Sequence, residues 1–223
     1  MNQEIEPIAV FKSPFTSKFG IPRQSGLTKT LHGRVVFMPE YKHKEAIRGI
    51  DGFDYLWLIW GFNKNHSHSL TVRPPRLGGN ERIGVFASRS PFRPNGLGLS
   101  SVRLVGIDKG ELIVAGADLM DGTPIYDIKP YIAYTDSHPD ARGGFTDSRE
   151  WQRLEVVMND CDFPTLSPEE LLALRESLAL DPRPHYHDDP KRIYGMPFCG
   201  IDVKFRVEGN VLTVLSEAPF PSR

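Results

Sequence analysis

The segment Arg82–Ser100 carries the residue types best suited to holding a polar ligand. Its loop places Arg89, Arg93 and Asn95 among two prolines and two glycines. Proline fixes the backbone and glycine permits unusual backbone angles, so we expect a loop of defined shape. Arginine side chains and open backbone amides in such a loop suit a polar or anionic ligand.

Two further segments carry related chemistry. Arg73–Asn80 reads R-P-P-R-L-G-G-N, and Asp118–Pro124 adds two carboxylates on a turn. Two His-X-His pairs stand at residues 66–68 and 185–187, and alternate histidines can share a metal. A metal site needs three or four ligands with further support, so we expect solvated loops there and no metal.

The elements that must position these residues are mainly short β-strands in the first 145 residues, with Gly and Pro in the turns. The strands predicted from alternating and apolar runs are Ile5–Phe11, Gly33–Phe37, Tyr55–Trp60, Ile83–Ala87, Ser101–Ile107, Glu111–Ala115 and Thr123–Ile128. A tight hairpin is expected at Asp108–Gly110 and a short helix at Tyr41–Arg48. The pattern predicts a barrel or sandwich, and it argues against a doubly wound α/β sheet because long helices do not alternate with the strands.

A second unit is predicted after a polar, breaker-rich stretch at residues 134–150. Ser167 with Pro168 and Glu170 forms a strong helix start, with a capping box and proline at the first helical position. Ile201–Val207 and Val211–Leu215 are expected to form a closing hairpin. We therefore predict two domains, at residues 1–146 and 147–223, the second smaller and α+β.

The charge of the chain is segregated, although its net charge is only −1. Residues 1–107 hold 15 basic and 7 acidic side chains, whereas residues 108–223 hold 12 and 21. Such asymmetry favours an anionic partner for the first half. The alternative is a basic surface without a partner.

Other features place the chain in a broad class. The acidic N-terminus does not resemble a secretory signal, and no apolar run is long enough to cross a membrane. Cys161 and Cys199 form no disulfide framework, so we predict a reduced, cytoplasmic setting. Dinucleotide-binding, Walker and nucleophile-elbow motifs do not occur in the sequence.

Five ordered blocks of sequence resemble the TrmO family of tRNA methyltransferases, whose domain is also called TsaA-like. The blocks are P-R-x-x-G-L (Pro22–Leu27), A-I-R-G-I-D-G-F-D-Y-L-W (Ala46–Trp57), V-R-P-P-R-L-G-G-N (Val72–Asn80), G-V-F-A-S-R-S-P-F-R-P-N-G-L-G-L-S (Gly84–Ser100) and D-L-M-D-G-T-P-I-Y-D-I-K-P-Y (Asp118–Tyr131). The resemblance implies a single-sheet β-barrel that binds S-adenosylmethionine outside the Rossmann class. It also implies a homodimer that methylates N6 of threonylcarbamoyl-adenosine beside the tRNA anticodon, at position 37.

Matching the family's cofactor contacts residue by residue gives a predicted S-adenosylmethionine site. Its members are Gln24, Ser25, Gly26, Phe62, Asn63, Arg89, Leu99, Asp118, Leu119, Met120 and Asp121. In this site Arg89 and backbone amides would face the carboxylate end, and Asp118 or Asp121 would accept from the ribose or the amine. Phe62, Phe86 or Phe92 would line the adenine or face the sulfonium, and Phe62, at the end of a predicted strand, is the preferred candidate for stacking.

The amine that is methylated must also lose a proton, and a nearby carboxylate could receive it. Asp121 is our first candidate for this catalytic role and Asp127 our second; the alternative is that Asp121 only closes an ordinary turn. For tRNA phosphates the predicted contacts are Arg23, Lys42, Lys44, Arg73 and Arg76.

Two other function classes compete with a methyltransferase. A non-catalytic module would bind S-adenosylmethionine or a nucleotide and contact a protein partner. A metal-dependent hydrolase would use the region around His185 and His187.

Overall fold

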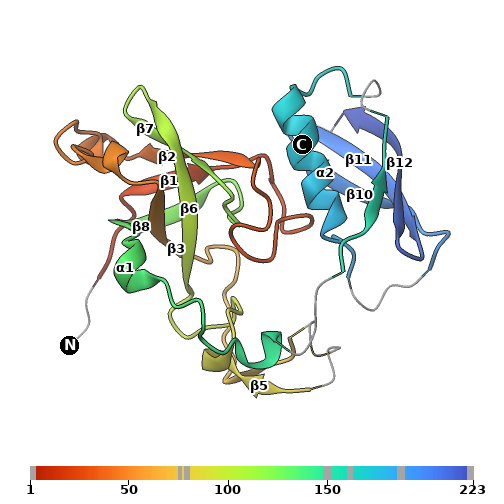
Figure 1. Cartoon of the computed structure of the whole chain (residues 1–223), viewed down its shortest axis with the longest axis horizontal. Coiled ribbons are helices and arrows are strands. Elements are labelled where there is room, and N and C mark those ends of the chain that lie inside the picture. Colours follow the sequence, from red (N-terminus) through yellow and green to blue (C-terminus); the bar gives the residue numbers. More distant parts are fainter. Residues whose placement is uncertain are drawn as a thin grey trace.

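Six antiparallel strands form a closed barrel in the first part of the chain (Figure 1). Around the barrel they follow the order β1 (Ala9–Lys12), β2 (His32–Phe37), β7 (Glu111–Ala115), β6 (Leu97–Asp108), β3 (Tyr55–Gly61) and β8 (Thr123–Pro130). The computed structural model describes residues 4–74, 77, 81–147, 152–159, 163–184 and 189–219, with side chains to residue 215 in the last range.

Alternate residues of the strands fill the barrel, as their period-two pattern requires. Val35, Leu56, Leu58, Val102 and Leu112 are completely or almost completely buried there. The predicted mainly β architecture with a single-sheet barrel is therefore confirmed.

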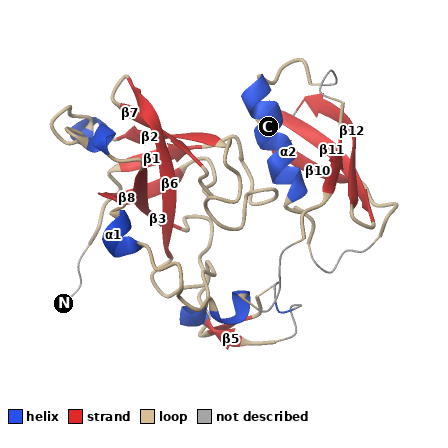
Figure 2. Ribbon diagram, viewed as in Figure 1, coloured by secondary structure: helices blue, strands red, loops and turns tan. Residues whose placement is uncertain are grey.

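A four-stranded sheet with one helix forms the second unit (Figure 2). Its strands follow the order β10 (Tyr194–Phe198), β11 (Ile201–Glu208), β12 (Val211–Pro219) and β9 (Glu155–Val157), and β9 runs parallel to β12. Helix α2 (Pro168–Ala179) begins at the predicted capping box: Ser167 Oγ accepts from the Glu170 amide, and the Glu170 carboxylate accepts from the Ser167 amide at 2.8 Å. This local signal was sufficient because it satisfies the first orphan amides of the helix.

The remaining elements are short. They are β4 (Thr71–Val72), β5 (Ile83–Gly84), α1 (Ala133–Asp136) and 3₁₀ helices at Pro39–Tyr41, Ile50–Gly52, Val85–Ala87 and Gly144–Thr146. Among the described residues, no helix has the length and apolar character needed to cross a membrane.

The predicted buried strand Ile83–Ala87 is wrong beyond its first two residues. After Gly84 the chain turns into a 3₁₀ helix in which Val85 is buried but Phe86 is 73% exposed. Side chains take the carbonyls that a strand would offer to a neighbour: Ser88 Oγ donates to the Val85 carbonyl at 2.8 Å, and Arg93 Nη1 donates to the Ser88 carbonyl at 2.6 Å. Such local bonds compete with a sheet ladder.

The predicted helix at Tyr41–Arg48 is also wrong. Isolated turns occupy this stretch, with bonds such as Ala46 N to His43 O at 3.1 Å. Only Ile47 is partly buried in it, so a helix would have no apolar face to pack, and short helices depend on such packing. Strand β10 was missed because it contains Pro197; β10 lies at the sheet edge, where proline is tolerated.

A long connection between β1 and β2, residues 13–31, packs against the second unit. We call it the connecting segment. Phe15 and Leu31 belong to the same buried cluster as Leu174, Met196 and Phe205 of the second unit. The connecting segment therefore contributes to both units, and the predicted boundary between residues 146 and 147 stays a prediction.

Candidate functional site

A relay of hydrogen bonds inside the barrel ends at Asp118, in the turn between β7 and β8. Trp60 of β3 donates from Nε1 to Ser100 Oγ at 2.9 Å, and Ser100 of β6 donates to Asp118 Oδ1 at 2.5 Å. Trp60 can reach Ser100 because Gly98 stands opposite it in the barrel, and a Cβ on Gly98 would lie 2.3 Å from the indole. The relay therefore holds the Asp118 carboxylate in one orientation from the barrel side.

Burial raises the pKa of Asp118 above its ordinary value. Four smaller influences oppose this rise: the Ser100 hydrogen bond, the backbone amide of Asp118 itself, the charge of Arg89, and the backbone amide of Ser25. A partly buried carboxylate with these neighbours is a strong acceptor for a ligand's hydroxyl or ammonium group.

The connecting segment brings Gln24, Ser25 and Gly26 to the same place. Arg89 Nη1 donates to Gln24 Oε1 at 2.7 Å. Gly26, with a φ of +80°, donates its amide to the Gly116 carbonyl at 2.8 Å. Three segments that are far apart in the sequence thus meet around Asp118 and Arg89.

The β3 end adds an aromatic side chain and an amide. The Phe62 ring meets the Trp60 ring edge-on, with centroids 4.3 Å apart, and the Phe62 amide donates to the Gly96 carbonyl at 2.8 Å. Asn63 donates from Nδ2 to the Gly122 carbonyl at 3.1 Å, which ties this end of β3 to the turn before β8. Leu99 is 54% exposed, so its side chain is open to a ligand or partner.

Within the turn itself only some side chains are available. Leu119 is buried in the barrel core, so only its backbone can reach a ligand. The Met120 carbonyl accepts from Thr123 Oγ1 at 2.7 Å and from the Thr123 amide at 3.2 Å, which closes the turn.

The two predicted proton acceptors are held in different places. Asp121 Oδ1 accepts from the Ser13 amide at 3.1 Å, and its Oδ2 lies 3.5 Å from Lys12 Nζ. Asp127 lies along β8, opposite Ile59, where it pairs with Lys129 at 2.8 Å. Asp121 lies in the turn before β8, whereas Asp127 lies four strand steps beyond the first residue of β8, at about 3.3 Å a step. The structure therefore does not bring them together.

The two loop arginines have different roles. Arg93 builds the loop: it donates to the Ser88 carbonyl, and its guanidinium lies over the Phe86 ring at 5.7 Å from the centroid. Arg89 instead faces Gln24. The residue types alone did not separate these two arginines, and they gave no sign of the hydrogen bond from Trp60 to Ser100. The glycine two residues before Ser100 was the available signal, because it marks a close approach of a large side chain.

The predicted RNA-binding cations do not form one patch. Arg23 donates to the Asp181 carbonyl at 3.4 Å, and Lys42 lies 3.6 Å from Glu111. Lys44 is exposed and lies two residues after Lys42, whereas Arg73 follows β4, which pairs with β5 in a two-stranded sheet separate from the barrel (β5 is labelled in Figure 1). Arg76 lies outside the described residues.

No group of three or more His, Cys, Asp or Glu side chains suited to a metal occurs in the described ranges. The pair at residues 66–68 falls inside those ranges, whereas the pair at residues 185–187 lies outside them.

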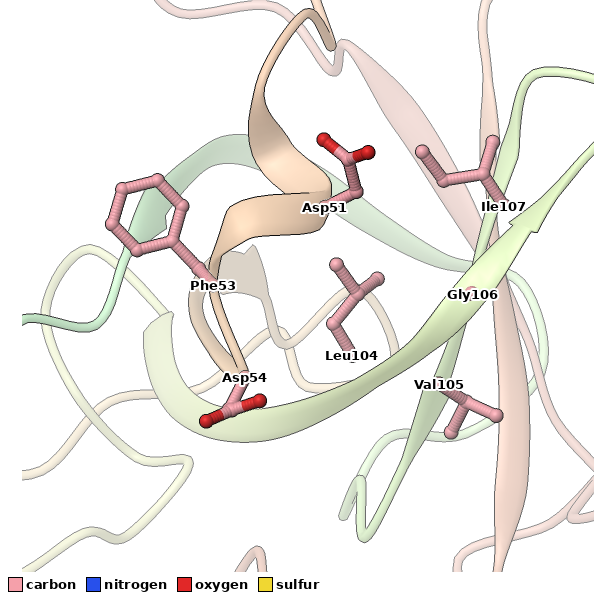
Figure 3. Close-up of a pocket in the computed structure, with 7 residues that line it drawn as sticks. All are labelled: Asp51, Phe53, Asp54, Leu104, Val105, Gly106 and Ile107. Carbon is pink, nitrogen blue, oxygen red and sulfur yellow. The ribbon is translucent and has the colours of Figure 1, made fainter.

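A shallow hollow of about 340 Å³ lies elsewhere on the barrel (Figure 3). It is lined by Asp51, Phe53, Asp54 and residues 104–107 of β6. None of the predicted site residues lines it. Its two carboxylates make it unsuited to the carboxylate or phosphate of a ligand.

Two family models match this chain, one over the barrel and one over the second unit. The model of the tRNA-methyltransferase O N-terminal domain matches residues 10–137, and that of the TrmO C-terminal domain matches residues 159–219. The tRNA (adenine(37)-N6)-methyltransferase of Escherichia coli K12 is 38% identical over 97% of this chain and 98% of its own length. A relative from Pseudomonas aeruginosa, named as an S-adenosylmethionine-dependent methyltransferase, is 39% identical over 91% and 92% of the two chains. A crystal structure of TrmO from Pseudomonas aeruginosa superposes with a TM-score of 0.81, at 32% identity over 98% of this chain and 99% of that one.

Proposed function

The chain belongs to the tRNA-methyltransferase O family, and from this premise we propose that it methylates N6 of adenine 37 in tRNA with S-adenosylmethionine as the methyl donor. The single observation that carries the proposal is the meeting of Gln24, Ser25, Arg89 and Asp118 from three distant segments. The names of the relatives favour this enzyme over a non-catalytic binding module.

The residues fit the ends of S-adenosylmethionine. Arg89 is the charged donor for the carboxylate of the amino-acid end, because guanidinium and carboxylate form strong paired hydrogen bonds. Asp118 accepts from the ammonium group or from a ribose hydroxyl, and the Trp60–Ser100 relay holds it in place. Phe62 offers a ring to the adenine or the sulfonium.

S-adenosylmethionine supplies a methyl group activated by the sulfonium. The protein's task is to hold N6 of the base in line with that carbon, so positioning is the main contribution. The N6–C bond forms as the C–S bond breaks, and the N6 proton must leave. We assign its removal to Asp121, which would exchange its contact with Lys12 for the substrate.

We propose threonylcarbamoyl-adenosine as the substrate base. An anticodon loop presents unstacked bases, which proteins recognise by stacking and by contacts to base edges. Exposed Lys44 and Arg73 are the proposed contacts to the phosphates on either side, together with the other predicted cations.

We further propose a homodimer in the cytoplasm. Leu70, Phe86 and Leu99 are 74%, 73% and 54% exposed, and Leu99 is a predicted member of the cofactor site. Large exposed apolar side chains mark interaction surfaces. Sedimentation equilibrium of the full chain tests this: a dimer that dissociates in the double variant L70D/F86D supports it, and a monomeric wild type contradicts it.

Calorimetry and a methyl-transfer assay test the main proposal. Replacing Arg89 by Ala removes a charged hydrogen bond of about 1.5–3 kcal/mol, so the Kd for S-adenosylmethionine should rise about 10-fold to 100-fold. R206A, which removes an exposed arginine from β11, is the matched control and should bind as the wild type does.

The substrate and the proton acceptor are tested in the same assay. Methyl transfer should occur on tRNA that carries the threonylcarbamoyl group and not on the unmodified transcript. D121N should lower kcat by about 10²-fold to 10⁴-fold with little change in the Kd for the donor. If D127N lowers kcat and D121N does not, our assignment is reversed; a wild type that binds no S-adenosylmethionine sinks the proposal.

A further inference from the structure

A carboxylate of the second unit grips the connecting segment just beyond the cofactor residues. Oε2 of Glu176, on α2, accepts from the Lys29 amide at 2.8 Å, from the Thr30 amide at 3.1 Å and from Thr30 Oγ1 at 2.9 Å. We propose that Glu176 is a positioning residue for S-adenosylmethionine, which makes the second unit part of the cofactor site. This inference rests on the function proposed above.

Further contacts to the second unit are made by residues that precede the Lys29–Thr30 turn. Arg153 Nη2 donates to the Leu27 carbonyl at 3.0 Å, and Arg23 Nη2 donates to the Asp181 carbonyl at 3.4 Å. Phe15 packs edge-on against Phe198, with ring centroids 5.4 Å apart, inside the core of the second unit. The connecting segment is therefore fastened to the second unit by polar contacts and by burial.

The same segment is fastened to the barrel only a few residues away. The Gly26 amide donates to the Gly116 carbonyl at 2.8 Å, and the Gly116 amide donates to the Leu31 carbonyl at 2.9 Å. A Cβ on Gly116 would lie 3.3 Å from the Thr28 carbonyl oxygen and 3.5 Å from Gly26, so backbone lies closely against backbone. A movement of the Lys29–Thr30 turn must therefore move Gly26 or break one of these bonds.

A movement of this turn would displace Gln24 and Ser25, which contact the proposed cofactor-binding side chains. Gln24 accepts a hydrogen bond from Arg89, and the Ser25 amide donates a hydrogen bond to Asp118. Among the described side chains of the second unit that contact residues 23–31, Glu176 accepts three hydrogen bonds whereas Arg153 donates one, so the loss of Glu176 should free this turn more than the loss of Arg153. Displacement of about 1 Å at a binding group is enough to weaken a preorganised site.

A purely structural role for Glu176 predicts a different result. Glu176 would then stabilise the second unit, and its loss would lower Tm without changing affinity in the folded protein. Calorimetry well below Tm separates the two roles, and so does the amide exchange of residues 23–31 in protein without S-adenosylmethionine, because exchange reports local opening.

The experiment uses four variants of the full chain. E176A removes the grip, E176Q keeps a neutral acceptor, L178A destabilises the core of α2 without touching the carboxylate, and E208A removes an exposed carboxylate from β11 as the matched control. We expect E176A to raise the Kd for S-adenosylmethionine about 10-fold and E176Q about 3-fold, as the loss of charge-assisted hydrogen bonds requires. L178A should lower Tm but not affinity, and E208A should change neither.

The kinetic and exchange readouts complete the test. In E176A the KM for S-adenosylmethionine should rise while the KM for tRNA stays unchanged, and exchange at residues 23–31 should be faster. Unchanged affinity and exchange in folded E176A would overturn the positioning role. If R89A weakens binding and E176A does not, only this inference fails; if neither variant weakens binding, the proposed cofactor site itself is wrong.

Discussion

Replacing Ser100 by Ala tests the relay that holds Asp118. The Ser100 hydroxyl accepts from Trp60 Nε1 at 2.9 Å and donates to Asp118 Oδ1 at 2.5 Å, and all of its own side chain is buried. Alanine fills nearly the same space but offers neither bond. The substitution therefore leaves a buried indole N–H without its acceptor and a carboxylate without its closest donor.

The magnitude follows from these two losses. A buried donor left without a partner costs about 1–3 kcal/mol. For a chain of this length each kcal/mol lowers Tm by about 2–4 °C, so a loss of about 2 kcal/mol corresponds to about 4–8 °C. The Ser100 hydrogen bond also holds down the pKa of Asp118, so its removal raises that pKa further. Affinity for S-adenosylmethionine should then fall most at the acidic end of its pH profile.

Thermal denaturation measures the loss of stability, and titration calorimetry across a pH series measures the change in affinity for S-adenosylmethionine. S101A is the matched control, because Ser101 is the next residue on β6 and its side chain lies outside the relay. We expect S101A to keep wild-type Tm and affinity. An S100A variant with wild-type stability and an unshifted pH profile would show that the relay does not hold Asp118.

Three further predictions follow from individual side chains. Because burial raises the pKa of Asp118, the folded state holds its proton more tightly than the unfolded state, so this carboxyl costs stability as pH rises through the range above its ordinary pKa. In D118N the urea midpoint should therefore fall less over that range than in the wild type, while S-adenosylmethionine binds more weakly; equal pH slopes would contradict it. Burial, together with Glu170, raises the pKa of Cys199 to about 12, so iodoacetamide at pH 8 should modify the Cys199 peptide only after unfolding, as mass spectrometry can show. G98A places a Cβ 2.3 Å from the Trp60 indole and should cost about 1–3 kcal/mol by overpacking, measured in urea, whereas unchanged stability would mean that the indole moves freely.

Local signals in the sequence predicted the elements that local bonds determine. The capping box at Ser167 predicted the start of α2, and the turn at Asp108–Gly110 predicted the β6–β7 hairpin, where Lys109 and Gly110 have φ values of 51° and 80°. The stretch Ile83–Ala87 has strand-like composition, but Arg93 and Ser88 take its carbonyls. These side-chain bonds form only because the loop brings Arg93 back over residues 85–88. The spacing of apolar residues in the sequence does not encode that loop path.

The site shows the same limit at longer range. Family resemblance named Gln24, Arg89 and Asp118 together, whereas spacing alone offered no reason to join them. Their meeting requires the closed barrel and a connecting segment held by the second unit. Glu176 was not predicted as a site residue. A glutamate on an amphipathic helix carries no local sign that it accepts hydrogen bonds from Lys29 and Thr30, which lie 147 and 146 positions earlier in the chain.

The charge segregation of the chain has an internal cause as well as an external one. Several basic side chains of the first half pair with acidic side chains of the second: Arg34 with Asp108 and Glu111, Lys42 with Glu111, and Lys12 with Asp121. Part of the asymmetry that favoured an anionic partner therefore stabilises the barrel's own strand ends. Contacts to RNA must come chiefly from cations outside these pairs, which makes exposed Arg73 a better phosphate contact than Lys42, whose charge is already opposed by Glu111.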